Sequence, residues 1–500
     1  MDERAAIPVS LPRANPTISY WQDPPDPEVA DHISSPSLPS TTDTVIIGSG
    51  ITGSSVAWNL LQNPNHGRIL ILEARQACSG ATGRNGTSLP SQFLDSEQYA
   101  DKLSTGGHTK AASYRSFLSN LRSLSPEEAT RIARLEYASI LSLHAFAREH
   151  NILCDSWQGD TVDIIYDQAQ WDEGVKAIEA MREIMSGEED RKGVSRYDFW
   201  TKEEAREKWG VKGEEFVGAV SYEAGSLSAY KFIIGLLKLC LKKGLELYTN
   251  TPALRIEKDG VEWIVETGKG KVKAKKVVLA TNGYTAHLWK GFQGSIVPLR
   301  GQITAHRPGS GMPKEGLPGT YSFIYANGYE YMIPRPPGSK FAGDIVIGGG
   351  LIKAKEEGLY EFGTTDDTTK NEEISRYLTE TTTRYFGQTW GEDDREGRVR
   401  KEWTGIMGYS SDGFPFVGEV PEQKALWVAA SFQGHGMVLC WLCAKALVGM
   451  MDGNRKDEEL NEWFPKVFKV TEERMNKRFK GRLHTKVRSL DIEAEAETGL

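Results

Sequence analysis

The chain has 500 residues, with 60 Lys and Arg against 68 Asp and Glu, and therefore a formal net charge of −8. The charges are interspersed, which argues against nucleic acid or an anionic membrane as a partner. At about 100 to 200 residues per domain, this length predicts two intertwined domains rather than one simple core. Five Cys residues without a repeated spacing favour a reducing compartment over a disulfide framework.

Residues 1–42 are rich in Pro, Ser and Asp with little periodicity, which predicts an extended or partly ordered arm. The first residues contain no apolar core of a signal peptide, and no stretch approaches about 18 uncharged apolar residues. We therefore expect no signal peptide, no membrane span and, by elimination, a cytoplasmic location.

The first compact pattern is TDTVIIGSGITGSSVAWNLLQNPNHGRILILEAR, at residues 42–75. Two apolar runs flank a glycine cluster and a segment of helical spacing, which predicts strand, turn, helix and strand. Gly48, Gly50 and Gly53 form GxGxxG there, suited to a sharp turn, close backbone approach to a pyrophosphate, and tight helix packing. Glu73 follows 20 residues after Gly53, where a carboxylate can accept from ribose hydroxyls. A dinucleotide site is predicted, with a coincidental glycine turn as the alternative.

The segment CSGATGRNGTSLP follows at residues 78–90. Its small and polar side chains cannot form the next strand-to-helix crossover that a nicotinamide enzyme would need. A longer cofactor with backbone laid along it explains these glycines, so the segment favours FAD over a nicotinamide dinucleotide.

Later segments continue in mixed α/β style. Helical spacing covers residues 108–150 and 231–244, and three strand-like runs over 245–282 predict an antiparallel meander. Residues 426–451 repeat the order of strand, glycine turn and helix. Cys440 and Cys443 have CxxC spacing in this apolar helix, which favours core packing over metal binding. We expect no metal site.

Seven motifs in this order resemble the FAD-dependent D-amino-acid oxidase superfamily. They are VIIGSGITGSSVAWNL, ILEAR, CSGATGRNG, ATNGYTAHLW, VPLRGQ, WTGIMGYSSDGFPFVG and GHGM. The nearer branch is similar to glycine and sarcosine oxidases and, through GATGRNG, to gamma-glutamylputrescine oxidase. The resemblance implies a mixed α/β fold, with a Rossmann-like FAD-binding domain assembled from discontinuous segments and a substrate domain bearing a mixed, largely antiparallel sheet.

The implied division of the chain has seven segments. They are the arm (1–42), three FAD-binding segments (43–150, 216–294 and 401–455), two substrate-domain segments (151–215 and 295–400) and a helical tail (456–500).

The resemblance also implies a set of residues along the cofactor, from the pyrophosphate and adenosine to the isoalloxazine. These residues are Gly48, Gly50, Ile51, Thr52, Gly53, Glu73, Ala74, Arg75, Ser79, Gly80, Thr82, Gly83, Arg84, Asn85, Gly86, Ala253, Leu254, Ala280, Thr281, Asn282, Gly434, His435, Gly436 and Met437.

The chain departs from the family pattern after Gly86. Relatives usually continue with a second glycine and then His or Gln, where this chain has Thr87 and Ser88. Neither residue can serve as a histidine tether, and RKEWTGIMGYSSDG contains no cysteine, so we expect noncovalent FAD. Cys78 is a rival tether, although a small buried cysteine is the simpler interpretation.

Candidate residues for the chemistry come from two segments. The turn at 434–437 opens a helix whose N-terminus can stabilise negative charge on a reduced flavin, and His435 is a candidate there for a direct role or for packing. In YSFIYANGYEYMIPR, the candidates facing the substrate are Tyr325, Tyr329, Tyr331 and Arg335. Arg335 can pair with a substrate carboxylate, and Arg300 is a second choice; plain sheet packing is the alternative for the tyrosines.

The reaction expected is FAD-dependent oxidation of a C–N bond in an amino acid, N-methyl amino acid or other amine. Hydride transfer to flavin N5 gives an imine and, with O2 as the acceptor, hydrogen peroxide; orientation and dryness supply the rate without a general base. The alternatives are a dehydrogenase with another electron acceptor, a catalytically silent flavin-binding protein and, most easily excluded, a nicotinamide dehydrogenase.

Overall fold

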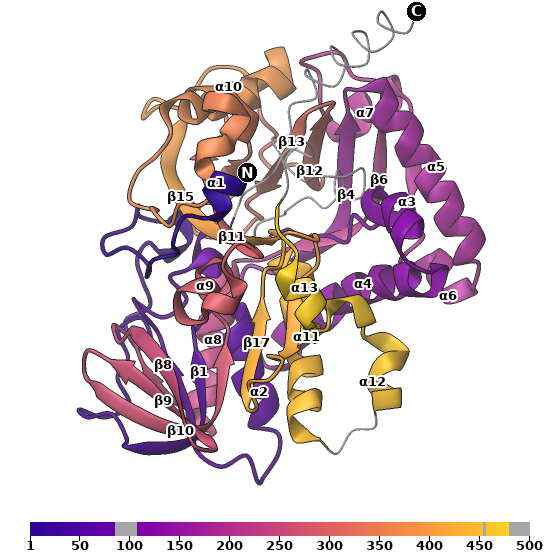
Figure 1. The fold of residues 1–500 in the computed structure, drawn as a ribbon. Coiled ribbons are helices and arrows are strands. Elements are labelled where there is room, and N and C mark those ends of the chain that lie inside the picture. Colours follow the sequence, from indigo (N-terminus) through magenta and orange to yellow (C-terminus); the bar gives the residue numbers. More distant parts are fainter. Residues whose placement is uncertain (86–107, 454–456, 480–500) are drawn as a thin grey trace, which may run out of the picture.

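The computed structural model describes residues 1–85, 108–453 and 457–479, which fold around two β-sheets (Figure 1). Eight strands of the described residues form the first, sheet A. They are β1 (Thr41–Ile47), β2 (Ile69–Leu72), β7 (Glu246–Tyr248), β8 (Ala253–Asp259), β9 (Glu262–Thr267), β10 (Gly270–Leu279), β16 (Phe416–Glu419) and β17 (Leu426–Ala430).

Sheet A has a parallel centre in the order β17-β10-β1-β2-β7. Strands β1 and β2 pair in parallel through Ile46 and Ile71 with helix α2 (Ile51–Leu60) between them in sequence, as the first compact pattern predicts. Strands β8, β9 and β10 form the antiparallel meander. Alternate side chains of β1 enter two cores, Ile46 on one face and Val45 and Ile47 on the other.

Sheet B contains nine strands of the described residues, in the order β15-β11-β14-β13-β12-β4-β6-β3 with β5 beside β6. Every pair in it is antiparallel except β4 with β12. The strands are β3 (His108–Thr109), β4 (Trp157–Ile165), β5 (Asp198–Trp200), β6 (Gly218–Ser226), β11 (Ile296–His306), β12 (Thr320–Tyr325), β13 (Gly328–Pro334), β14 (Ile345–Gly348) and β15 (Val399–Ser410). The mixed α/β fold with a largely antiparallel second sheet is thereby confirmed.

Helices cover both sheets. Besides α2, the α-helices of the described residues are α1 (Asp2–Ala5), α3 (Tyr114–Ser123), α4 (Pro126–Glu149), α5 (Gln168–Ile184), α6 (Glu188–Lys192), α7 (Lys202–Trp209), α8 (Ala229–Lys242), α9 (Thr285–Leu288), α10 (Glu372–Phe386), α11 (Gly436–Asp452), α12 (Asp457–Trp463) and α13 (Glu472–Asn476). In Figure 1, α2, α8 and α11 lie beside sheet A, whereas α3, α5, α7 and α10 surround sheet B.

Three segments assigned from the sequence contain strands of the other sheet. Strand β3, at 108–109, pairs with β6 in sheet B, although 43–150 was assigned to the FAD-binding part. Strand β6, at 218–226, pairs with β4 in sheet B, although 216–294 was assigned to the FAD-binding part. Strand β15, at 399–410, pairs with β11 in sheet B, although 401–455 was assigned in the same way. Turn and strand patterns in a sequence locate a strand but do not show which strand it pairs with. The sequence therefore did not separate these strands from sheet A. The division into domains stays a prediction.

The N-terminal arm packs along the molecule. Tyr20 and Trp21 are buried, and the Tyr20 ring stacks on Trp403 of β15 with 6.0 Å between ring centroids. Ser19 Oγ donates to the carbonyl oxygen of Gly83 at 2.7 Å, and Trp21 Nε1 donates to that of Asn85 at 3.0 Å. The arm therefore fixes the segment that follows the glycine turn.

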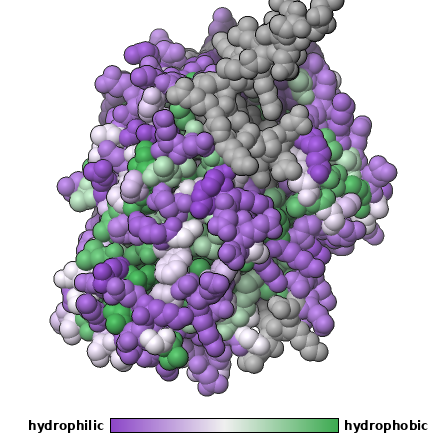
Figure 2. All heavy atoms as spheres, in the orientation of Figure 1, coloured by the Kyte–Doolittle hydropathy of each residue, from purple (hydrophilic) through white to green (hydrophobic). Residues whose placement is uncertain are grey.

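Hydrophilic and hydrophobic side chains alternate over the face of the molecule shown in Figure 2. Among the described residues, no helix combines the length and the apolar character needed to cross a membrane.

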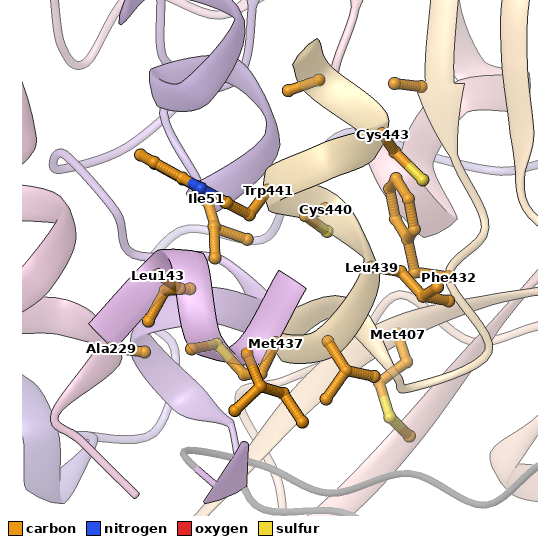
Figure 3. Close-up of a cluster of buried hydrophobic side chains, with 14 of the residues drawn as sticks. Ile51, Leu143, Ala229, Met407, Phe432, Met437, Leu439, Cys440, Trp441 and Cys443 are labelled. Atoms are coloured by element: carbon orange, nitrogen blue, oxygen red, sulfur yellow. The ribbon is translucent and has the colours of Figure 1, made fainter. Parts of the chain in front are cut away.

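All five cysteines are unpaired and buried. Figure 3 shows Cys440 and Cys443 on α11 among apolar side chains, with Phe432 nearby. Burial raises the pKa of the Cys440 thiol to about 12, which keeps the thiol protonated. Core packing of this pair, as expected from its apolar helix, is confirmed.

Candidate flavin site

A cavity, partly open to solvent, lies at the carboxyl ends of the parallel strands of sheet A. Gly48 follows β1, Glu73 follows β2, Ala280 follows β10 and Phe432 lies just after β17, and all four line the cavity. In open parallel sheets, ligands bind at this edge because loops and helix N-termini converge there. The described residues that line the cavity fall within the ranges 11–12, 47–52, 72–85, 253, 280–288, 405–407 and 432–440.

The glycine turn after β1 brings backbone to the cavity wall. Gly48 has a φ of +106°, and a Cβ at this position would lie 2.6 Å from the carbonyl oxygen of Ala280. A Cβ on Gly53 would lie 1.9 Å from the carbonyl oxygen of Gly48, so helix α2 packs on its own turn only with glycine there. The first N–H groups of α2 have no intrahelical acceptor and create a site for an anion at the cavity.

Glu73 closes the turn from the second strand. One carboxylate oxygen accepts from the backbone N–H of Ser49 at 3.0 Å and from its hydroxyl at 2.6 Å. The other oxygen accepts from the backbone N–H of Arg75 at 3.0 Å. Glu73 thus orients the glycine turn, and it also lines the cavity where the sequence placed a ribose.

Residues 78–85 form a tight turn followed by a 3-10 helix at Ala81–Arg84. A Cβ on Gly83 would lie 2.0 Å from the carbonyl oxygen of Cys78, whereas one on Gly80 would meet no atom within 4 Å. The hydroxyl of Thr82 accepts from the backbone N–H of Ile51 at 3.0 Å, which joins this segment to the start of α2. Small residues are therefore needed here for close backbone packing and for cavity space.

Two arginines line the cavity around a buried carboxylate. Asp367 Oδ2 lies 2.8 Å from Arg75 Nη1 and 3.7 Å from Arg84 Nε. Arg84 also donates to the carbonyl oxygens of Ser79 and Thr404 at 3.1 and 2.7 Å. Burial lowers the pKa of Arg84 to about 10, and Asp367 opposes this shift, so the guanidinium remains positive at neutral pH. Asp367 and the carbonyl oxygens thus hold both guanidinium groups at this wall of the cavity.

Several buried polar atoms at the cavity have no hydrogen-bond partner in the described residues. They are both side-chain polar atoms of Asn85, the hydroxyl of Tyr284 and Nε2 of His287. Buried polar groups usually have partners, so these atoms indicate a polar ligand. An elongated lining with a helix N-terminus, two arginines and unpaired amide groups fits a dinucleotide that carries a polar ring system.

The turn between β17 and α11 forms another wall of the cavity. Ser431 and Gln433 have φ values of +64° and +52°, a strained conformation for residues other than glycine. Asn282 Oδ1 accepts from the backbone N–H of Ser431 at 2.9 Å, and Gln433 Nε2 donates to the hydroxyl of Ser410 at 2.7 Å. These bonds hold the turn so that backbone at the N-terminus of α11 borders the cavity.

Most of the cofactor residues expected from the sequence come together at this cavity. The lining includes Gly48, Gly50, Ile51, Thr52, Glu73, Ala74, Arg75, Gly80, Thr82, Arg84, Asn85, Ala253, Ala280, Thr281, Asn282, Gly434, Gly436 and Met437. Gly53, Ser79, Gly83, Leu254 and His435 are outside the lining, and Gly86, Thr87 and Ser88 lie outside the described residues. Leu254 is 41% exposed, because it points away from sheet A where its neighbour Ala253 is buried.

The substrate-facing candidates do not line the cavity. Arg335 Nη2 pairs with Asp155 at 2.5 Å, and Arg300 Nε pairs with Glu361 at 2.6 Å, so both guanidinium groups have carboxylate partners. Tyr325 donates to the hydroxyl of Tyr385 at 3.0 Å, within the core on the opposite face of sheet B from Tyr329 and Tyr331.

Tyr329 and Tyr331 pack into the same core as Met407, a cavity residue, and the hydroxyl of Tyr331 is buried without a partner in the described chain. Figure 3 draws Met407 and, at the start of α11, Met437, and both line the cavity. The roles of Tyr331, Arg335 and His435 stay predictions.

Other residues that line the cavity were not predicted from the sequence as cofactor or substrate residues. They are Leu11, Pro12, Ile47, Leu72, Ala81, Tyr284, His287, Leu288, Gly405, Ile406, Met407, Phe432 and Cys440. Tyr284 and His287 lie in ATNGYTAHLW and Met407 in WTGIMGYSSDG, so these motifs already marked the segments. Leu11 and Pro12 carried no signal, because a proline-rich arm gives no indication of where it packs.

Comparison with known proteins agrees with this geometry. Residues 43–450 match the DAO family, described as FAD dependent oxidoreductase. The chain is 25% identical over 423 residues to the probable oxidoreductase OrdL of Rhizobium meliloti (strain 1021), covering 84% of this chain and 85% of the relative. It is 21% identical over 427 residues to the glycine oxidase of Bacillus licheniformis, covering 84% and 96%.

Solved structures share the fold. The glycine oxidase of Geobacillus kaustophilus superimposes with a TM-score of 0.63 at 20% identity, over 87% of this chain and 99% of that one. The L-proline dehydrogenase of P. horikoshii gives a TM-score of 0.62 at 18% identity, over 86% and 98%. The match of the family over most of the length, together with the cavity, establishes that this chain belongs to the DAO family of FAD-dependent oxidoreductases.

Proposed function

We propose that the protein oxidises a C–N bond of an amino acid, N-methyl amino acid or other amine, with noncovalently bound FAD in the cavity described above. The main support for the proposal is that the glycine turn, residues 78–85 and the turn before α11 all line one cavity. Relatives named glycine oxidase support an amino acid or amine as the substrate.

FAD, when bound, would accept a hydride, which carries both electrons of the oxidation. The chain supplies binding and orientation: the N-terminus of α2 would hold the anionic part, Arg75 and Arg84, themselves held by Asp367, line the same cavity, and Asn85 offers an amide donor and acceptor. Backbone at Gly436 and Met437, at the N-terminus of a 17-residue helix, stabilises negative charge that develops at this end of the site.

Apolar residues keep water from the reacting end. Ile406, Met407, Phe432 and Met437 line the cavity, and their low polarity strengthens electrostatic interactions inside it. A neutral amine held there needs no protein base for loss of its α-hydrogen as hydride.

The test is an anaerobic screen of the purified protein with amino acids, N-methyl amino acids and polyamines. We expect at least one amine to bleach the visible band of the bound flavin, and the α-hydroxy acid of matching carbon skeleton to leave the band intact. Bleaching by dithionite but by no amine contradicts the proposal. Admitting air then separates an oxidase, which forms one peroxide per amine consumed, from a dehydrogenase, which stays reduced until a quinone is added.

A separate measurement tests whether FAD is bound noncovalently. Acid precipitation should release all the flavin into the supernatant, because Cys78 is fully buried and burial raises its thiol pKa, which disfavours the reactive thiolate. Yellow colour that stays with the precipitated protein contradicts noncovalent binding.

A further inference from the structure

Arg115 presents a buried guanidinium without an acceptor. Its side chain extends from α3, the residue is 8% exposed, and neither Nη1 nor Nη2 has a hydrogen-bond partner within the described residues. The guanidinium carbon lies 4.6 Å from the ring centroid of Tyr329 on β13, so the group is stacked on one face and unpaired at its edge.

The nearby carboxylate is already committed to other donors. Asp163 on β4 pairs through Oδ1 with Lys110 Nζ at 2.6 Å, while Oδ2 accepts from the hydroxyls of Tyr114 and Tyr222 at 2.8 and 3.0 Å. Lys110 and Asp163 are completely buried and neutralise each other. Arg115 therefore leaves one positive charge in this group without a balancing carboxylate.

A small cavity adjoins Arg115 between α3, α5 and strands β4 and β12. Leu118, Ile165 and Ile324 make most of its wall apolar, and Gln170 adds an amide. Glu173 also borders it, but its side chain is 44% exposed and lies 3.8 Å from Arg122, on the solvent side. A buried guanidinium at the wall of an apolar cavity is costly unless an anion occupies that cavity.

We propose that Arg115 is the anchor of a buried binding site for a small monocarboxylate. A carboxylate matches the planar fork of a guanidinium with two parallel hydrogen bonds. A single negative charge balances the one uncompensated charge of Lys110, Arg115 and Asp163, whereas a doubly charged phosphate would exceed it. The cavity is small, which limits the ligand to a small molecule.

The carboxylate can come from two sources. One is the carboxylate end of the amine substrate, since Tyr329, which stacks under Arg115, and the flavin-cavity residue Met407 lie on β13 and β15 of the same sheet. This source rests on the proposed function. The other source is a separate small carboxylate that binds beside α3 without taking part in the reaction.

Calorimetric titration of the full-length, FAD-loaded protein with sodium acetate tests the site, with acetamide as the neutral probe of equal shape. We expect acetate to bind, acetamide not to bind, and Arg115→Met to weaken acetate binding at least tenfold. Arg122→Met is the matched control, since Arg122 lies on the same helix with its side chain 45% exposed. Equal binding of acetate and acetamide, no binding of acetate, or an unchanged affinity in Arg115→Met overturns the proposal.

Thermal unfolding without acetate separates ligand recognition from packing. Removing an uncompensated buried charge should leave the unfolding midpoint of Arg115→Met unchanged or raised, and acetate should raise the midpoint of the unaltered protein only. A lowered midpoint together with unchanged acetate binding makes Arg115 a packing residue and overturns the proposal.

Competition distinguishes the two sources. Acetate that competes with the amine in anaerobic flavin reduction assigns the site to the substrate carboxylate, whereas acetate binding that is insensitive to the amine assigns it to a separate ligand. Because the titration measures heat and not flavin reduction, a failure of amine oxidation leaves the acetate result standing.

Discussion

Gly53→Ala tests the contact that places helix α2 on its own turn. The new methyl carbon would lie 1.9 Å from the carbonyl oxygen of Gly48 and 3.2 Å from Cγ2 of Ile46. Since the first of these atoms belongs to the backbone, the helix must shift by more than 1 Å to reach an ordinary contact distance of about 3.2 Å. Gly80→Ala is the matched control, because a methyl group there meets no atom within 4 Å.

The two substitutions are expected to change the free energy of unfolding in different directions. Overpacking of a tight contact costs about 1–3 kcal/mol, and the better helix propensity of Ala at an interior position returns up to about 1 kcal/mol. Gly53→Ala should therefore lower the free energy of unfolding by about 1–2 kcal/mol or more. Gly80 has a φ of −81°, which suits any residue, so Gly80→Ala should leave the flavin-free protein unchanged or more stable by about 0.4–1 kcal/mol.

Chemical unfolding of the flavin-free variants measures these changes, and flavin retention on gel filtration measures cofactor binding. Gly80 borders the cavity, so its methyl group should weaken FAD binding although stability is kept. Gly53→Ala should lose both stability and FAD. Wild-type stability in Gly53→Ala refutes the packing argument, and full FAD retention in Gly80→Ala refutes the path of the cofactor past this residue.

Three further predictions concern single polar contacts. Thr82→Val removes the acceptor of the buried Ile51 N–H and should cost about 1–3 kcal/mol in chemical unfolding, whereas Thr82→Ser should keep most of the stability. Asn85→Ala should leave the stability of the flavin-free protein within about 0.5 kcal/mol but weaken FAD binding measured by fluorescence, because its side-chain amide has no hydrogen-bond partner among the described residues. Burial, with Arg148 second, lowers the pKa of His144 to about 4, so the unfolded chain binds a proton that the folded chain does not between about pH 6.5 and 4. Stability should fall as the pH is lowered through this range, by up to about 3 kcal/mol from this group, and His144→Gln should reduce the slope; an equal slope in the variant contradicts the assignment to His144.

The sequence predicted the dinucleotide-binding half of the molecule well because its signals are local. Gly48, Gly50 and Gly53 meet geometric requirements set by atoms a few residues away, and a strand–turn–helix order fixes where the turn must face. The parallel pairing of β1 with β2 then follows from the short connection through α2.

The substrate-domain residues were less predictable because their surroundings depend on long-range pairing. Tyrosines in β12 and β13 looked alike in sequence, yet Tyr325 and Tyr331 lie on opposite faces of sheet B. Arg335 appeared free for a substrate, but Asp155, 180 positions earlier, holds it. Arg115 gave no signal in sequence, since a cation in a helical segment is usually exposed and only the fold shows that it is buried.

An anaerobic titration of the FAD-loaded protein with the best amine from the screen tests the central claim most directly. The account predicts complete bleaching of the flavin band at one amine per bound FAD, with one equivalent of the carbonyl product formed by hydrolysis of the imine. Loss of this bleaching in a Gly80→Ala protein reloaded with excess FAD would link the chemistry to the described cavity. A flavin that dithionite reduces but that no amine reduces at any ratio would contradict the account.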